Sequence, residues 1–160
     1  MKEMEVRLER LNKLRAAYSY SDGSFPEEEA FKKIMSWAER KGLLSKEGVR
    51  FFGRNTYPND KVEGHGYECF LTIENQTVYN DIEISEIPSG LYAVLRFKDI
   101  RNISFAWNKL WTWIEEKGYE YAGWLKGKHG WVSGFEEQVN WQENATPTKW
   151  IYDLWLPLEE

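Results

Sequence analysis

Apolar residues recur at helical spacing in two segments of the chain, and the two segments resemble each other. Their sequences are AFKKIMSWAERKG at residues 30–42 and AWNKLWTWIEEKG at residues 106–118. Aligned at an offset of 76 residues, six of their thirteen positions are identical. Apolar side chains three or four positions apart lie on one face of a helix, and glycine is common just past a helix end. The pattern therefore predicts two related helices that stop at Gly42 and Gly118.

Before and after each helix the apolar positions alternate, which is typical of strands with one buried face. The clearest runs are Met4, Val6 and Leu8; Tyr67, Cys69, Leu71 and Ile73; Leu91, Ala93, Leu95 and Phe97; and Trp150, Tyr152, Leu154 and Leu156. The pattern thus predicts a strand, a helix and further strands in each half of the chain. We expect one domain, residues 1–160, with an α+β fold. Two duplicated βαββ halves, about residues 1–80 and 81–160, would form a curved antiparallel sheet with two helices and a cleft.

The chain is unusually rich in aromatic side chains. Nine tryptophans, nine tyrosines and eight phenylalanines make up 16% of the 160 residues. Most aromatic residues pack in cores, but a buried tryptophan also needs a hydrogen-bond acceptor for its indole N–H. So many tryptophans in a domain of this size suggest that some of them line a ligand cavity.

Charge and the remaining composition exclude several classes of function. The formal net charge is −5, from 26 acidic and 21 basic side chains, and nonspecific nucleic-acid affinity depends on clustered Lys and Arg. We therefore expect no direct binding to nucleic acid. No apolar segment has the length of a membrane span or the features of a signal peptide, and the single cysteine, Cys69, cannot form an internal disulfide. A cytoplasmic protein that does not bind membranes is expected. No spacing of ligating residues indicates a metal, and no phosphate loop indicates a cofactor.

Several motifs together resemble the GyrI-like family, the effector-binding domain that also occurs at the C-terminus of multidrug-responsive transcription regulators. In order over residues 82–158, they are EISEIPSGLYAVLRF, LWTWIEEKGYE, GFEEQVN and YDLWLPL. The first half matches more loosely, through its strand–helix opening and FFGRNTYPN. The regulators' DNA-binding domain has no counterpart before the first half, so the chain is expected to be a stand-alone member.

The resemblance implies an aromatic cleft with an acidic residue that binds drug-like, often planar or cationic compounds. The acidic position matches Glu136, and Gln138 stands where the family often has a tyrosine. From the residues alone, Glu136 and Glu137 could equally be a solvated pair on an edge strand, and Trp107 could be a core residue. The candidate ligand-binding residues are Glu136, Trp107, Trp111, Trp150, Tyr152, Phe52, Tyr57 and Phe31.

Two functions follow from the same residues. The first is sensing or sequestering hydrophobic, planar or cationic compounds (multidrug recognition) without turnover. The second is a hydrolase for detoxification or self-protection, because some relatives open the cyclopropane ring of DNA-alkylating natural products. In that case the catalytic residues would be Glu136, which would activate water, and Tyr67 or Tyr152, which would polarise a carbonyl. A protein target such as gyrase is a weaker third hypothesis, since some stand-alone relatives inhibit that enzyme.

Overall fold

The computed structural model describes residues 4–57, 65–122 and 125–160. Residues 58–59 of the FFGRNTYPN motif, and residues 123–124 between the second helix and the next strand, lie outside the described residues. The helices are α1 (Pro26–Arg40) and α2 (Ile103–Glu116). The strands are β1 (Val6–Leu11), β2 (Leu14–Ser21), β3 (Phe51–Tyr57), β4 (Gly66–Thr72), β5 (Glu83–Ile87), β6 (Gly90–Lys98), β7 (Leu125–Gly127), β8 (Gly130–Val132), β9 (Phe135–Gln138) and β10 (Ile151–Pro157).

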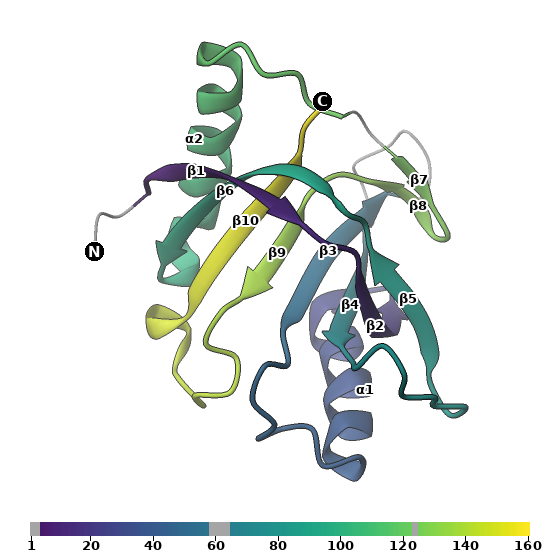
Figure 1. The fold of residues 1–160 in the computed structure, drawn as a ribbon. Helices are drawn as coiled ribbons and strands as arrows, with labels where there is room; N and C mark the ends of the chain where they lie inside the picture. Colours follow the sequence, from purple (N-terminus) through teal and green to yellow (C-terminus); the bar gives the residue numbers. More distant parts are fainter. Residues whose placement is uncertain (1–3, 58–64, 123–124) are drawn as a thin grey trace.

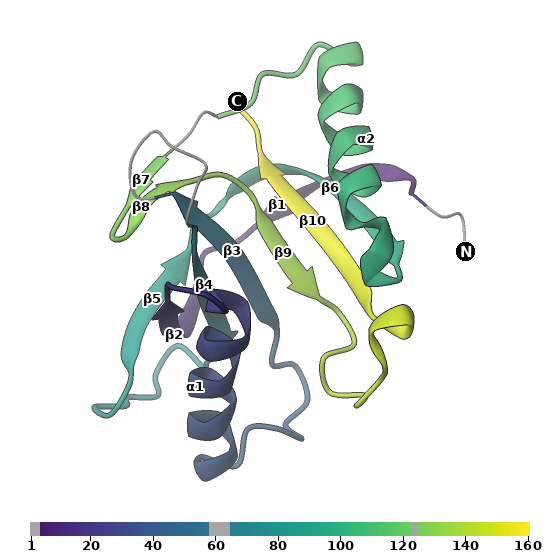
Figure 2. The ribbon, with the colours of Figure 1, turned by 180° about the vertical axis from the view of Figure 1, so that it is seen from behind.

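The described strands form one curled antiparallel sheet that carries both helices on one face (Figures 1 and 2). Its order is β1-β6-β10-β9-β3-β4-β2-β5, with the β7–β8 hairpin attached to β3. The segment β2-α1-β3-β4 supplies one side and the segment β6-α2-β9-β10 supplies the other. They meet where β9 pairs with β3, which we call the seam. The predicted α+β fold is confirmed.

The helices form where the hydrophobic pattern predicts them. Ala30, Ile34 and Trp37 of α1 are buried against β2 and β4, and the equivalent face of α2 is buried against β6 and β10. Past the two helix ends, Gly42 and Gly118 adopt φ angles of 71° and 75°, a left-handed conformation that glycine adopts without steric cost. Neither described helix is long and apolar enough to cross a bilayer.

The sheet curls because the first strand of each half pairs with the other half. β1 pairs with β6 and β5 pairs with β2, although only residues 12–13 separate β1 from β2 and residues 88–89 separate β5 from β6. The β1–β2 segment and the β5–β6 segment run antiparallel through both short connections, from Leu11 opposite Gly90 to Leu14 opposite Ile87. The sheet bends where these connections lie side by side. Alternation at residues 4–8 predicted a strand that enters the first helix. That position belongs to β2, and β1 lies at the sheet edge beside β6.

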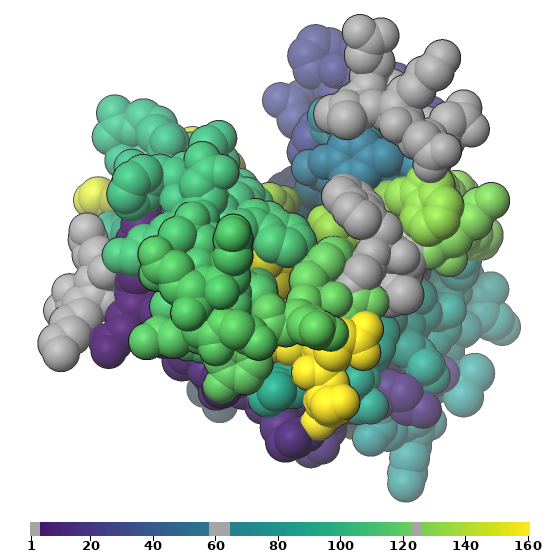
Figure 3. All heavy atoms as spheres, turned by 90° about the horizontal axis from the view of Figure 1, so that it is seen from above, coloured from purple at the N-terminus to yellow at the C-terminus, as the bar shows by residue number. Residues whose placement is uncertain are grey.

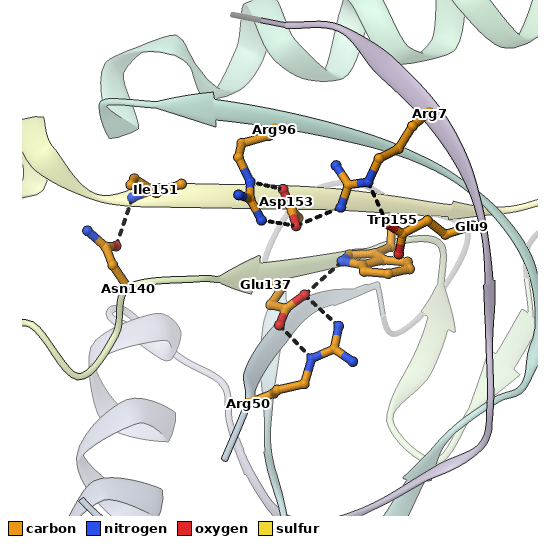
Figure 4. A network of polar contacts seen from close by, with 9 residues as sticks. All are labelled: Arg7, Glu9, Arg50, Arg96, Glu137, Asn140, Ile151, Asp153 and Trp155. Carbon is orange, nitrogen blue, oxygen red and sulfur yellow. Dashed lines mark hydrogen bonds and ion pairs between the residues drawn. The ribbon is translucent and has the colours of Figure 1, made fainter. Parts of the chain in front are cut away.

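The face of the sheet away from the helices encloses a second core that contains buried ion pairs. Aromatic residues such as Phe52, Phe70 and Trp155 fill it. Arg50 donates two hydrogen bonds to Glu137, at 2.8 and 2.9 Å, and Figure 4 shows this pair beside Trp155. The ion pairs compensate carboxylates that would otherwise be buried without a partner.

Candidate functional site

A cavity of about 680 Å³ opens on the helix-bearing face, above the seam between β9 and β3. α1 and α2 flank this part of the sheet (Figure 2), and the space-filling view from above shows a notch between the α2 side and the α1 side (Figure 3). The start of α1, the segment before α2, the sheet and the β9–β10 connection line the cavity. The lining residues are Glu27, Glu28, Phe31, Phe51, Asn55, Tyr67, Ile100, Ile103, Glu136, Gln138, Trp141, Asn144, Ala145, Trp150 and Tyr152.

Glu136 lies on the floor of this cavity and its carboxylate has two donors. The Tyr67 hydroxyl of β4 donates to Oε1 at 3.0 Å, and the Trp107 indole N–H of α2 donates to Oε2 at 3.4 Å. Burial raises the pKa of Glu136, and the hydrogen bonds from Tyr67 and Trp107 oppose that rise. The two donors come from the two sides of the seam, so the carboxylate joins both halves of the domain.

Tyr67 is held as a hydrogen-bond donor. Burial, together with the negative charge of Glu136, raises the pKa of its hydroxyl well above the usual value. A tyrosine in this environment keeps its proton at neutral pH and can donate to Glu136 or to a ligand. The Tyr67–Glu136 hydrogen bond is therefore a preorganised polar contact in a cavity that also has aromatic walls.

The cavity brings together several aromatic residues that the sequence nominated. Tyr152 of β10 lines it with its ring stacked on Phe97, at 5.7 Å between ring centroids, and burial raises the pKa of the Tyr152 hydroxyl. Trp150 lines it while its indole N–H donates to the Ala145 carbonyl at 2.8 Å. Phe31 of α1 lines it and packs edge-to-face on Phe51. These rings form its apolar walls.

Phe52 and Tyr57 lie elsewhere. Phe52 has no exposed surface and packs in the second core, on the face away from the helices, whereas its neighbour Phe51 lines the cavity. Successive strand residues point to opposite faces, so an error of one position moves a side chain to the other side of the sheet. Tyr57, at the end of β3, accepts a long hydrogen bond from Asn55 at 3.5 Å and is not among the lining residues.

Of the two α2 tryptophans that the sequence nominated, Trp107 and Trp111, Trp107 reaches the acidic residue. Its N–H contacts Glu136, although its ring is not among the lining residues of the cavity. Trp111, one turn later, is 37% exposed and packs edge-to-face on Tyr121, at 4.7 Å between ring centroids. α2 thus contributes one hydrogen-bond donor, the Trp107 indole, to Glu136. Trp111 lies outside the cavity, partly exposed beside Tyr121.

Glu136 and Glu137 have different roles because they lie on opposite faces of β9. Glu136 lies opposite Gly53 of β3 and faces the cavity, whereas Glu137 lies opposite Phe52 and faces the second core. There it accepts hydrogen bonds from Arg50 and from the Trp155 indole (Figure 4). The alternative of a solvated pair on an edge strand is therefore wrong for both residues.

Some lining residues were not predicted from the sequence. Trp141 lies in the connection after β9, and its indole N–H donates to the Val49 carbonyl at 3.0 Å. Glu27 and Glu28 lie in the first turn of α1, where acidic residues also favour the helix dipole. The aromatic excess predicted a tryptophan-lined site in general, but no local pattern distinguishes Trp141 from a core residue.

The charges that line the cavity are all negative among the described residues. They belong to Glu27, Glu28 and Glu136, and Glu27 contacts the His65 ring nitrogen at 2.6 Å. The described residues contain no cluster of ligating side chains suited to a metal ion. Aromatic walls and carboxylates together favour an apolar ligand with a positive charge.

Comparison with known proteins places these features in a family. The model of the GyrI-like small molecule binding domain matches residues 4–124. A search of curated protein sequences gives no match.

Solved structures share the fold at low sequence identity. The chain superposes on EcmrR from an EcmrR–DNA complex with a TM-score of 0.64 and 13% identity; it is covered completely and spans 59% of the EcmrR chain. A hydrolase from Listeria innocua gives a TM-score of 0.66 and 7% identity, with coverage of 99% and 94%. SAV2435 bound to tetraphenylphosphonium gives a TM-score of 0.58 and 14% identity, with coverage of 98% and 94%.

Proposed function

The chain belongs to the GyrI-like small-molecule-binding domain family, and on that premise we propose that its cavity binds hydrophobic, planar or cationic compounds, with a preference for cations. The observation that carries this proposal is the lining itself. Its charged members among the described residues are carboxylates, and its walls are aromatic. The biological role would be sensing or sequestration of drug-like compounds.

In this proposal, the preference for cations comes from the attraction between the Glu136 carboxylate and a positive charge on the ligand. A carboxylate that has lost part of its hydration gains more from a ligand cation than an exposed carboxylate does. Tyr67 and Trp107 use one acceptor position on each oxygen, and a carboxylate offers about four such positions. Because Glu136 lines the cavity, the proposal leaves its other acceptor positions to a cationic group of the ligand.

The aromatic walls supply the rest of the affinity. A cation over an aromatic ring gains roughly 0.5–2 kcal/mol, and micromolar binding requires about 8 kcal/mol. Phe31, Trp141, Trp150 and Tyr152 offer rings on several sides of the cavity. Several such contacts, together with the interaction with Glu136 and the burial of apolar ligand surface, are needed to reach the micromolar range.

Isothermal titration with a cation and a neutral compound of similar shape tests the proposal. Tetraphenylphosphonium is the cation, since a protein of the same fold binds it, and triphenylphosphine oxide is the neutral compound. Glu136→Gln is expected to weaken the cation about tenfold or more and the neutral compound much less. Glu116→Gln, at an exposed position of α2, is the matched control and should change neither. Absence of saturable binding of both compounds to the unmodified protein at millimolar concentration would refute the proposal.

A second candidate function is hydrolysis of strained cyclopropane-bearing natural products. It is favoured by the 3.0 Å contact between Tyr67 and Glu136, which pairs a proton donor with a carboxylate of raised pKa beside Tyr152 in the same cavity. Glu136 would take a proton from water as the water oxygen bonds to a cyclopropane carbon. The C–C bond of the ring to that carbon breaks, its electron pair moves onto the conjugated carbonyl oxygen, and Tyr67 or Tyr152 would donate a hydrogen bond to that oxygen. Mass spectrometry of such a compound incubated with the protein separates the functions: more than one ring-opened product per protein indicates turnover. A protein target such as gyrase stays a prediction from the resemblance alone.

A further inference from the structure

Gly53 lies directly opposite Glu136 across the seam, on the cavity face of β3. It is buried, and the Tyr67 ring occupies the space where a side chain would stand. A Cβ built on Gly53 would lie 1.9 Å from the Tyr67 Oη and 2.4 Å from its Cζ. Tyr67 itself pairs with Asn55, two residues along β3. Its side chain therefore crosses Gly53 diagonally to reach the Glu136 carboxylate.

We propose that Gly53 is a positioning residue of the cavity, because the absence of a side chain there lets the Tyr67 ring lie across β3 and donate a hydrogen bond from its hydroxyl to Glu136. This inference rests on the proposed function for its effect on ligands. The contact between Tyr67 and Glu136 is independent of that function.

The atoms that a side chain would meet show which group would move. Gly53 is paired on one side with Cys69 of β4 and on the other with Glu136 of β9, so its backbone is held by two strands. The three nearest atoms to the added Cβ all belong to the Tyr67 side chain. A methyl group at this position therefore displaces the ring, and the hydroxyl leaves Glu136.

Gly134, another glycine near the site, also has no room for a side chain, but for a different reason. A Cβ on Gly134 would lie 2.4 Å from the Trp155 carbonyl oxygen and 3.1 Å from Cη2 of Trp107. The first obstacle there is backbone, so Gly134 is required by the packing of the strands themselves. At Gly53 the obstacle is one functional side chain, and the requirement for glycine is specific to the Tyr67–Glu136 contact.

Loss of the Tyr67 donor has a defined consequence. Among the described residues, the carboxylate would keep the longer bond from Trp107 as its donor. Removal of a donor that favours the ionised form raises the pKa of Glu136 further. Glu136 would then stay protonated to a higher pH than in the unmodified protein, and a protonated acid attracts a cation weakly. Gly53→Ala and Tyr67→Phe should have the same effect, because both remove one hydrogen bond.

A titration of the ligand-free protein tests this directly. The carboxyl ¹³C resonance of Glu136, assigned by its absence in Glu136→Gln, is followed against pH. Gly53→Ala and Tyr67→Phe are expected to move its midpoint upward by similar amounts, and the double variant no further. Gly127→Ala is the matched control, because its Cβ would meet nothing closer than 3.5 Å. An unchanged midpoint in either Gly53→Ala or Tyr67→Phe would overturn the inference.

A second arm measures tetraphenylphosphonium affinity from pH 5 to pH 9. Below the ¹³C midpoint measured for the unmodified protein, Gly53→Ala should weaken binding about tenfold, the scale of one hydrogen bond to a charged group. The weakening should fade as pH rises above the midpoints. If the unmodified protein does not bind while the ¹³C midpoints move as expected, the proposed function fails and the positioning role stands. If the cation binds and depends on Glu136, but binds Gly53→Ala unchanged at every pH, the positioning role fails alone.

A double-mutant cycle covers the case in which Gly53→Ala does not fold well. Thermal unfolding is measured for Gly53→Ala, Tyr67→Ala and the double variant. Because the Tyr67 ring is the obstacle, the stability loss caused by Gly53→Ala should largely disappear when residue 67 is alanine. An equal loss in both backgrounds would show that glycine is needed for another reason and would overturn the inference.

Discussion

Replacing Arg50 by methionine would remove the cation that compensates the buried Glu137. Arg50 precedes β3 and Glu137 belongs to β9, so their two hydrogen bonds, at 2.8 and 2.9 Å, cross the seam between the halves (Figure 4). The guanidinium also lies over the rings of Phe52 and Trp155, at 4.9 and 5.6 Å. After the substitution, the Trp155 indole N–H, at 3.1 Å, is the remaining donor to this carboxylate among the contacts described here.

The expected loss of stability follows from the burial of the two groups. Breaking a fully buried ion pair by removing one partner costs about 3–5 kcal/mol. The Glu137 side chain is 8% exposed but that of Arg50 is 34% exposed, so water already solvates part of the cation. We therefore expect Arg50→Met to lower the free energy of unfolding by about 2–4 kcal/mol.

Arg96→Met is the matched control on the same face. Arg96 binds Asp153 twice, at 2.9 and 3.0 Å, but Arg7 also donates to Asp153, at 3.0 Å. The carboxylate keeps a partner, and the Arg96 side chain is 43% exposed, so a loss of about 1 kcal/mol is expected. Urea unfolding followed by tryptophan fluorescence measures both variants. If Arg50→Met costs no more than Arg96→Met, the seam ion pair does not stabilise the domain as argued.

Three further predictions concern the cavity. Burial raises the pKa of Glu136 in the folded state, so the folded protein holds this proton more tightly and stability falls as pH rises from the ordinary glutamate pKa through the raised one. Glu136→Gln should remove this dependence of the free energy of unfolding on pH, so that the variant gains at most about 1.4 kcal/mol per pH unit relative to the unmodified protein. Urea unfolding from pH 4 to pH 8 measures both proteins, and a constant difference in free energy of unfolding between them would contradict this. Phe51→Leu should weaken tetraphenylphosphonium about three- to tenfold, whereas Phe52→Leu should lower stability and leave the affinity measured by titration unchanged; equal effects on affinity would refute the assignment of faces. Tetraphenylphosphonium at one hundred times its dissociation constant should raise the free energy of unfolding by about 2.7 kcal/mol, and a denaturation midpoint that does not move with ligand concentration would argue against binding to the folded state.

The periodicity of the chain was enough to predict both helices and the α+β class. The repeated segments at 30–42 and 106–118 carry their own helical spacing and closing glycines, and these are local properties. The alternation of Tyr67, Cys69 and Leu71 likewise predicted one face of β4, and these residues pack together beneath α1. Local patterns sufficed because each element buries one face, and the sequence records which positions belong to it.

The partners of each element could not be predicted in the same way. The pairing of β1 with β6 and of β5 with β2 joins residues that lie 65 to 89 positions apart, and no local pattern encodes it. The choice between Phe51 and Phe52 depends on the register of β3 against β9, where a shift of one residue exchanges the two faces.

Composition and motifs were sufficient to predict that an acidic residue and many aromatic residues were available, and the family motif pointed to Glu136. The three-dimensional packing was needed to show that Tyr67 reaches that carboxylate over Gly53, that Trp107 approaches it from α2, and that Glu137 is paired with Arg50 on the other face. The physical reason is that a hydrogen bond depends on distances of about 3 Å between atoms. Such distances are set by how distant strands and helices pack, and hydrophobic periodicity specifies only which face of each element turns inward.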